Sequence, residues 1–197
     1  MFVLGGNGMN KQKKERREEF IAAAKEIINS QGYEACTVRS ICQYVGVAPS
    51  SFYHCFEDKD EVIFMIAMQV DPFFEENEHR FTSEDPRENL ALFMRLYFQQ
   101  VERDGYEYVW RFHTLQKGNR YKVDNRAGRA VFRILNRIIY QGSALLYGDM
   151  NEDEVFNLIM TMLRGQTFDW ARNEGRYSLS EAGEKNIPAY VRAVFKP

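Results

Sequence analysis

Cysteine and histidine are scarce in this sequence, which has three residues of each. An odd number of cysteines does not make a disulfide framework, and this favours a reducing compartment, the cytoplasm. The histidines are scattered without the spacing of a metal site, and no nucleophile elbow, phosphate-binding loop or paired-carboxylate motif accompanies them. We therefore expect no metal and no cofactor, and an enzyme is the weaker alternative. These residues are Cys36, Cys42 and Cys55, and His54, His79 and His113.

Long hydrophobic runs and low-complexity segments are missing as well. Because no segment offers the ~20 consecutive apolar residues that a transmembrane helix needs, a membrane partner is not expected. The start of the chain, from Met1 to Gly8, lacks a basic region and ends in glycine, so we interpret residues 1–9 as a flexible leader. The few prolines and glycines fall between periodic segments, where they separate structural elements.

Net charge is nearly absent, with a formal value of -2, so bulk electrostatics neither requires nor excludes a nucleic-acid partner. Locally, positive charge is concentrated in a basic run at residues 10–17, which could bind phosphate. Taken alone, this run is better interpreted as a solvated helix start. Its cations are Lys11, Lys13, Lys14, Arg16 and Arg17, against Glu15 alone.

Helical periodicity is abundant, and it predicts an all-α chain of about nine helices. The first helix has apolar residues on one face and ends near Gly32. A second, short helix follows the N-cap residue Thr37 and ends at Gly46, and a third helix opens at Pro49. Two short helices joined by a tight turn and packed on a preceding helix make a helix-turn-helix module, which we place at residues 10–58.

The remaining segments predict a larger helical domain at residues 59–197. A fourth helix begins with the sequence from Asp58 to Glu61, which is close to a capping box, and is kinked or ended by Pro72. Further helices are expected from Pro86, from about residue 106 to 116, from Ala127 to Leu146, from Asn151 and from Ser178.

The third helix of the module turns a small polar face outward. Helical spacing places Phe52 and Phe56 toward the core, so that Ser50 and His54 point directly away from it. Small hydroxyl groups let a helix backbone sink into the major groove of DNA, and histidine can donate to bases or phosphates. Ordinary surface helices show the same pattern, so both interpretations stay open at this point.

Lys59 lies in the first turn of the fourth helix, where the helix macrodipole disfavours a cation. A phosphate group is the partner that such a position suggests, because a helix N-terminus offers free N–H groups beside the lysine. Thr37 could offer a hydroxyl and a backbone N–H to the same DNA strand. Simple capping by Thr37 and a solvated lysine are the alternative.

The module contains the runs Thr37-Val-Arg-Ser-Ile41, Val45-Gly-Val47 and Ser51-Phe-Tyr53, followed by Phe56 and Lys59. In order and spacing, this set resembles the DNA-binding signature of TetR-type regulators over residues 16–62. The resemblance implies phosphate contacts from Thr37, Tyr53 and Lys59, with base contacts mainly from the third helix. The DNA-binding residues that we predict are Thr37, Arg39, Ser50, Ser51, Tyr53, His54 and Lys59.

Four positions depart from the family pattern, and two of them, Cys42 and Val45, stand where alanine is common, which changes core packing and not contacts. Ala48 stands where serine is common, so the third helix is expected to lack a side-chain cap. Ser50 stands where glycine is common, and its side chain could alter base preference without changing the mechanism.

The resemblance also implies a homodimer that binds a palindromic operator on double-stranded DNA as a repressor and is released by a small, largely apolar effector. Residues 59–197 would bind the effector and dimerise through the last two long helices, near residues 151–175 and 178–195. Gly165 inside the first of these suggests the close approach of another helix. A regulator without an effector is one alternative. A thiol-responsive regulator is another, although Cys42 and Cys55 fall on buried faces.

The effector pocket is expected between the fourth and eighth helices, with bulky apolar walls and a few polar groups. Each candidate could instead be an ordinary core residue, because aromatic and methionine side chains at helical spacing usually are. The candidates are Met68, Phe93, Met94, Tyr97, Trp110, His113 and Tyr140.

A basic stripe runs along one side of the long helix. We interpret it as a solvated face that pairs with local acidic residues, and an anionic ligand is the lesser alternative. Its members are Arg126, Arg129, Arg133 and Arg137.

Overall fold

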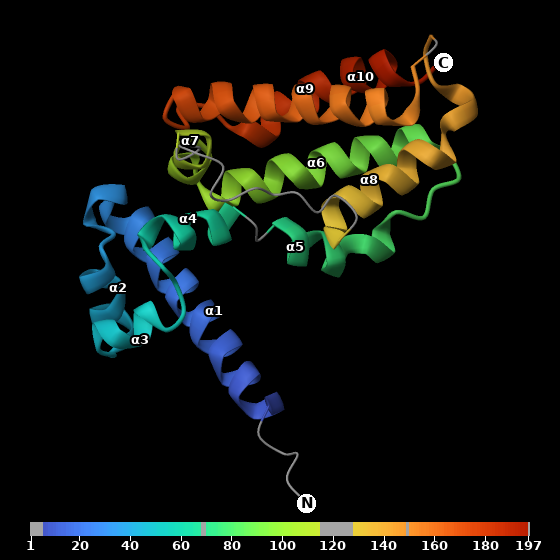
Figure 1. The fold of residues 1–197 in the computed structure, drawn as a ribbon. Helices are drawn as coiled ribbons and strands as arrows, with labels where there is room; N and C mark the ends of the chain where they lie inside the picture. The colour runs from blue at the N-terminus through green and yellow to red at the C-terminus, as the bar shows by residue number, and fades with distance from the viewer. Residues whose placement is uncertain (1–5, 68–69, 115–127, 149, 197) are drawn as a thin grey trace, which may run out of the picture. The chain divides into compact units, whose positions relative to one another are not determined.

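The computed structural model describes residues 6–67, 70–114, 128–148 and 150–196, except for the side chains of residues 6–10, 67 and 112–114 (Figure 1). Most of these residues are helical, and β pairing within them is limited to an isolated bridge between Leu146 and Phe195. The prediction of an all-α chain with a helix-turn-helix and a larger helical body is confirmed. None of the described helices is long and apolar enough to cross a membrane.

The described chain forms two compact units. The first unit holds residues 6–67, and the second holds residues 70–113 and 128–196. This division differs from the predicted boundary after residue 58, because the fourth helix packs on the first. Its inward side chains Val62, Ile63 and Ile66 are fully buried.

The first unit consists of a long helix and four short elements: α1 (Gly6–Gln31), η1 (Tyr33–Ala35), α2 (Val38–Val45), α3 (Pro49–Tyr53) and α4 (Lys59–Ala67). Helix α1 begins at Gly6, so residues 6–9, which we predicted to be part of a flexible leader, are helical. Helices α2 and α3 pack on each other, and α2 packs on α1.

Local signals account for the ends of α2. The Thr37 hydroxyl accepts a hydrogen bond from the Ser40 backbone N–H at 3.0 Å, and the Ser40 hydroxyl accepts from the Thr37 N–H at 2.8 Å. At the other end Gly46 has a φ of 76°, a left-handed conformation that glycine adopts without strain. Helix α3 then begins at Pro49 without a side-chain cap, because Ala48 has no group to offer, as predicted.

The second unit contains six α-helices and two short 3-10 turns within the described residues. Helix α6 is its centre and packs against α5, α8, α9 and α10 (Figure 1). These elements are α5 (Val70–Asn77), η2 (Glu78–Arg80), α6 (Pro86–Asp104), α7 (Tyr106–Thr114), α8 (Ala130–Gln141), η4 (Ser143–Leu145), α9 (Glu152–Arg172) and α10 (Leu179–Val194).

Two helix boundaries differ from their predictions. Pro72 does not end a helix, because it lies within α5, which continues to Asn77. Helix α8 ends at Gln141 and not at Leu146. The next residue, Gly142, lies against the Phe195 ring with no room for a Cβ, so the chain turns there and Leu146 pairs with Phe195.

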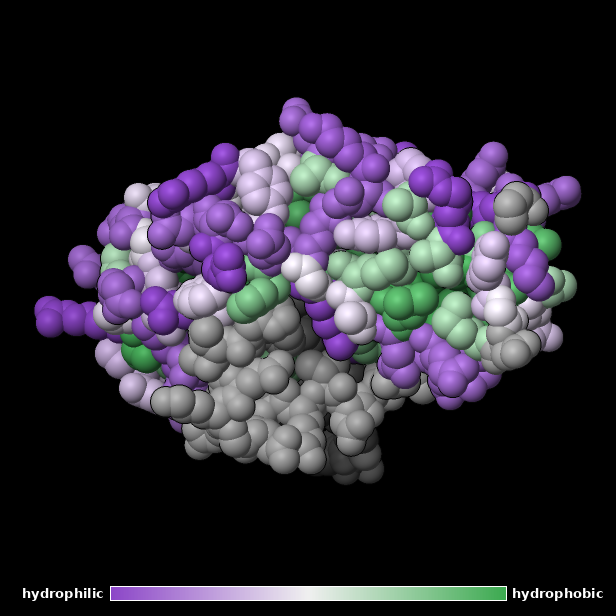
Figure 2. All heavy atoms as spheres, turned by 90° about the horizontal axis from the view of Figure 1, so that it is seen from above, coloured by the Kyte–Doolittle hydropathy of each residue, from purple (hydrophilic) through white to green (hydrophobic). Residues whose placement is uncertain are grey.

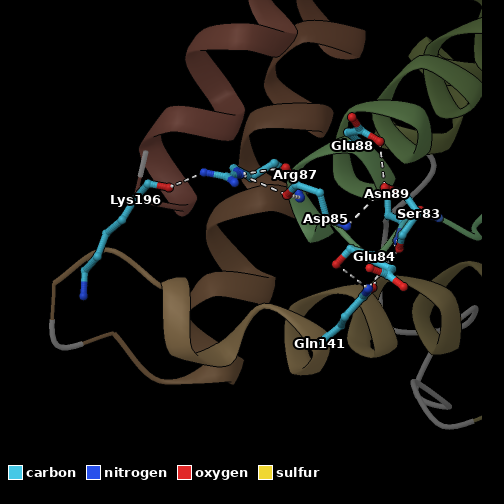
Figure 3. Close-up of polar contacts among 8 residues, drawn as sticks. All are labelled: Ser83, Glu84, Asp85, Arg87, Glu88, Asn89, Gln141 and Lys196. Carbon is cyan, nitrogen blue, oxygen red and sulfur yellow. Dashed lines mark hydrogen bonds and ion pairs between the residues drawn. The ribbon is translucent and has the colours of Figure 1, made fainter.

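A polar network fixes the start of α6 to the end of α8 and to the last described residue (Figure 3). The buried Asn89 amide donates to the Ser83 carbonyl at 2.8 Å and to the Gln141 side chain at 3.0 Å. Gln141 in turn donates to the Ser83 carbonyl at 3.0 Å. The Arg87 guanidinium donates to the Lys196 carbonyl at 3.2 Å, so three segments far apart in the sequence are held together.

Candidate nucleic-acid interface and effector site

Helix α3 presents the outward face that its sequence predicts. Ser50 and His54 are exposed, and the Tyr53 side chain is 60% exposed. Ser51 is half-buried at the edge of this face. On the opposite side Phe52 is fully buried, with its ring centroid 5.4 Å from that of Phe20. Burial of Phe52 therefore orients the helix so that its polar side faces solvent.

The helical part of α3 is shorter than predicted. It ends at Tyr53, with His54 as the C-cap, although we expected Cys55 and Phe56 to lie within it. The two later residues remain buried, because the chain keeps turning: the backbone N–H groups of Cys55 and Phe56 donate to the Phe52 carbonyl at 2.8 and 2.9 Å.

Arg17 connects α1 to both ends of the segment that follows α3. Its guanidinium donates to the Cys55 carbonyl, pairs with the Glu61 carboxylate at 2.9 Å, and lies 4.2 Å from the centroid of the Phe56 ring. We call these four residues, Arg17, Cys55, Phe56 and Glu61, the Arg17 cluster. It holds the end of α3 and the start of α4 against α1.

The start of α4 is a capping arrangement close to the predicted one. The Asp58 carboxylate accepts from the Glu61 backbone N–H at 2.9 Å. The Glu61 carboxylate in turn accepts a hydrogen bond from the Glu57 backbone N–H at 2.8 Å, one residue before Asp58. Glu61 therefore serves both the cap and the Arg17 cluster.

Three of the predicted DNA-binding residues lie at helix starts. Thr37 is exposed at the N-cap of α2, and its hydroxyl is engaged in the cap. Arg39 is exposed in the first turn of α2. Lys59 is the first residue of α4, half-buried, and its Nζ lies 3.9 Å from the centroid of the Tyr33 ring.

Two tyrosines of the first unit were not singled out from the sequence. Tyr44 on α2 is 60% exposed, as exposed as Tyr53. It lies opposite Cys42 on α2 but only three residues after the buried Ile41, so helical spacing alone does not reveal its exposure. The contact between Tyr33 and Lys59 joins residues 26 positions apart, and no local pattern predicts it.

The basic run of α1 is largely paired along the helix. Three of its cations lie within 4.0 Å of glutamates three or four residues further on, in exposed pairs of little energetic weight. This supports its interpretation as a solvated helix start. The pairs are Lys11 with Glu15, Lys14 with Glu18, and Arg16 with Glu19.

The cysteines are buried inside the first unit. Burial raises the pKa of the Cys36 thiol to about 11, although the nearby charge of Lys59 acts in the opposite direction. Burial also raises the pKa of Cys42. Because the thiolate is the reactive form, both groups are poor candidates for a redox sensor near neutral pH.

Three of the predicted effector residues lie together along α6. Phe93 and Met94 are fully buried, and Phe93 lies 4.8 Å from Phe74 between ring centroids. Tyr97 follows one turn later, half-buried, and burial raises the pKa of its hydroxyl. These side chains form part of the core of the second unit.

Two further predicted effector residues, Tyr140 and Trp110, do not lie beside these three α6 residues. Tyr140 is 73% exposed on the outer side of α8. Trp110 is 36% exposed and stacks on Phe168 of α9, with 5.7 Å between ring centroids. Met68 and the side chain of His113 lie outside the described residues.

The basic stripe of α8 is paired with acidic residues, as we interpreted it from the sequence. Arg129 contacts Asp71 at 2.6 Å, and Arg133 and Arg137 both contact Glu78, at 2.8 and 2.7 Å. Hydrogen bonding from Arg133 is the main cause that lowers the pKa of Glu78. Arg126 lies outside the described residues.

Helices α9 and α10 share a face of mixed polarity. Gly165 is exposed on α9, and a Cβ built on it would meet nothing within 4 Å. The Gln166 side-chain oxygen accepts from the Tyr190 hydroxyl at 2.9 Å, which joins the two helices. Figure 2, which looks onto α9 and α10, shows hydrophobic side chains gathered among hydrophilic ones on this face.

Within the described residues, no group of three or more histidine, cysteine, aspartate or glutamate side chains could hold a metal ion.

Comparison with known proteins matches residues 20–66 to the bacterial regulatory proteins of the tetR family. The fatty acid metabolism regulator protein of Bacillus subtilis (strain 168) is 26% identical over 179 residues, which cover 86% of this chain and 90% of that protein. The structure of Thermus thermophilus FadR in complex with lauroyl-CoA has a TM-score of 0.66 at 18% identity and covers 92% of this chain and 96% of its own. FadR from Bacillus subtilis in complex with stearoyl-CoA has a TM-score of 0.62 at 19% identity, with 89% and 98% covered. These two structures show a shared fold.

The Arg17 cluster predicts a stability difference between neighbouring arginines. Arg17→Ala is expected to lower the free energy of unfolding by about 2 kcal/mol, because it removes a hydrogen bond, a ring contact and the cation beside the half-buried Glu61. Arg16→Ala breaks an exposed pair with Glu19 and is expected to cost less than ~0.5 kcal/mol. Urea denaturation followed by circular dichroism measures both, and equal losses would contradict the role of the cluster.

Proposed function

Because this chain belongs to the TetR family of bacterial transcriptional regulators, we propose that it is a homodimeric repressor that leaves its operator when an acyl-CoA thioester binds. The observation that carries the proposal is the polar outward face of α3, oriented by the burial of Phe52 within a segment that matches the family. The second unit provides the effector site and the dimer contact.

DNA binding follows from placing α3 in the major groove. Ser50 and His54 would face the bases, because they point away from the buried Phe52. Tyr53, Thr37 and Lys59 would contact the phosphate backbone and fix the position of the helix. In a dimer, two such helices would read the half-sites of a palindrome about 34 to 36 Å apart.

Two observations support an acyl-CoA effector. The relative that covers most of this chain is a regulator of fatty acid metabolism, and two structures of the same fold hold stearoyl-CoA and lauroyl-CoA. In addition, Phe93, Met94 and Tyr97 lie together on α6 in an apolar core, so an alkyl chain that entered there would contact apolar side chains. Most of the binding free energy would come from the acyl chain, since each buried methylene contributes about 0.8 kcal/mol.

Dimerisation is proposed through the shared face of α9 and α10. Gly165 lies on this face, and a Cβ at this position would have no described neighbour within 4 Å. Packing within one protomer therefore does not require a glycine there. A mid-helix glycine costs about 1 kcal/mol relative to alanine, and the close approach of a partner helix is a reason to keep it. Half-buried Leu158 and Met162 on the same helix would be covered by the second copy.

The DNA-binding proposal predicts different effects for two exposed tyrosines. Tyr53→Ala is expected to weaken binding to DNA from the protein's own upstream region by about tenfold, because it removes a phosphate contact. Tyr140→Ala, which removes a similarly exposed ring from the second unit, should leave binding unchanged. Fluorescence anisotropy over a salt series, with an unrelated fragment as control, measures both. Wild-type protein without preference for its own region would contradict the proposal.

The effector proposal predicts release of DNA by acyl-CoA. Lauroyl-CoA and stearoyl-CoA are expected to weaken operator binding at least tenfold at micromolar concentration, while octanoyl-CoA acts more weakly because it buries fewer methylenes. CoA and laurate, each carrying only half of the ligand, are the controls. If operator binding persists with both long-chain thioesters, the effector is of another class or the protein acts without one.

The dimer proposal predicts that Gly165→Arg produces a monomer. The substitution fits the isolated protomer, since nothing lies within 4 Å of the new side chain's first atom, but it would block a partner helix. Tyr140→Arg on α8 places the same charge on another exposed surface and should remain dimeric. Sedimentation equilibrium distinguishes the two states, and a dimeric Gly165→Arg protein would exclude this face.

A further inference from the structure

We infer that Tyr33 is a positioning residue for DNA binding: its ring holds the ammonium group of Lys59 at the place where a DNA phosphate would meet it. The inference rests on the proposed DNA-binding function and deepens it. Tyr33 is not among the residues that we predicted to contact DNA.

The contact itself is a cation–π interaction. Lys59 Nζ lies 3.9 Å from the centroid of the Tyr33 ring, within the range of about 6 Å in which a cation is attracted to an aromatic face. Glu57, Asp58 and Asp60 flank the lysine in the sequence, yet its ammonium group lies over the ring. Both side chains are half-buried, so the contact is partly shielded from water.

This contact joins the start of α4 to the turn that precedes α2. Tyr33 belongs to η1, four residues before Thr37, which caps α2, while Lys59 opens α4. The lowering effect of the Lys59 charge on the pKa of the Cys36 thiol is further evidence that the ammonium group lies near the start of α2. Thr37 and Lys59, the two residues proposed to bind phosphate outside α3, therefore share one surface.

The ring also compensates an unfavourable position. A cation in the first turn of a helix is repelled by the macrodipole, and a cation–π contact of similar strength opposes that repulsion. An ammonium group has three N–H donors, so those directed away from the ring can serve a phosphate. A lysine that is already held loses less side-chain entropy on binding than a free one does.

A double-mutant cycle tests whether Tyr33 acts through Lys59. The variants are Tyr33→Leu, which removes the aromatic face, Tyr33→Phe, which keeps it, Lys59→Gln, and Tyr33→Leu combined with Lys59→Gln. Affinity is measured for a non-specific duplex as well as for the upstream region, because phosphate contacts do not depend on base sequence.

We expect Tyr33→Leu to bind each duplex about three- to tenfold more weakly and to lower the salt slope by up to about one. Tyr33→Phe should bind within about twofold of the wild type, since its ring keeps the π face. In the Lys59→Gln background, Tyr33→Leu should cause no further loss. A purely structural role for Tyr33 would instead give losses that add.

Additive losses, or unchanged affinity in Tyr33→Leu, would overturn the inference while leaving the proposed regulator intact. A wild-type protein that binds no duplex would overturn both. If Tyr33→Leu does not fold, an NMR spectrum of the wild-type protein tests the contact instead. When the Lys59 ammonium group lies over the Tyr33 ring, the ring shifts the neighbouring Lys59 methylene protons upfield. Lys59 methylene shifts at ordinary values would overturn the inference.

Discussion

Helix α3, which we propose as the recognition helix, has five residues and is too short to hold its own shape, and the first unit is built around that constraint. Isolated helices of this length are unstable, because the nucleation cost exceeds the gain from one or two hydrogen bonds. In α3 the missing stability comes from neighbours: Phe52 is buried against Phe20, and the Arg17 cluster holds the residues that follow. The polar face of α3 is therefore fixed from behind and from its C-terminal end.

The same dependence extends to α4. Glu61 accepts from Arg17 and caps its own helix through Glu57, so the start of α4 and the end of α3 are fixed by one carboxylate. Lys59, which precedes Glu61 by two residues, is placed by this arrangement as well as by the ring of Tyr33. In the second unit α6 has the corresponding role, because four other helices pack against it.

Much of this fold is predictable from sequence where the signals are local. Thr37, Pro49 and Asn151 each mark a helix start through a cap or a fixed φ, and the structure has helices beginning at all three places. Distant partners decide the rest. Helix α8 stops at Gln141, and the Phe195 ring occupies the space where a Cβ would lie at residue 142, a contact that the local sequence does not reveal.

The residues of the candidate sites also fall into two groups, those that local sequence locates and those that only the fold places. The outward residues of α3 follow from helical spacing and one buried face, so Ser50, Tyr53 and His54 can be located from the sequence. Residue type alone assigns Tyr140 to the effector pocket, and it lies on the outer side of α8 because the other side packs into the core. The contact of Tyr33 with Lys59 depends on how α4 returns toward η1, which only the fold determines.

The burial of Phe52 separates what keeps α3 in place from what α3 displays. The residues that hold it face inward or belong to α1 and α4, while Ser50 and His54 are exposed. Substitutions on the outer side can therefore accumulate without unfolding the module, and if α3 reads DNA as we propose, operator preference can change during evolution while the scaffold stays unchanged. A designer who wished to redirect such a protein to a new DNA sequence would have the same freedom, limited to very few side chains by the shortness of the helix.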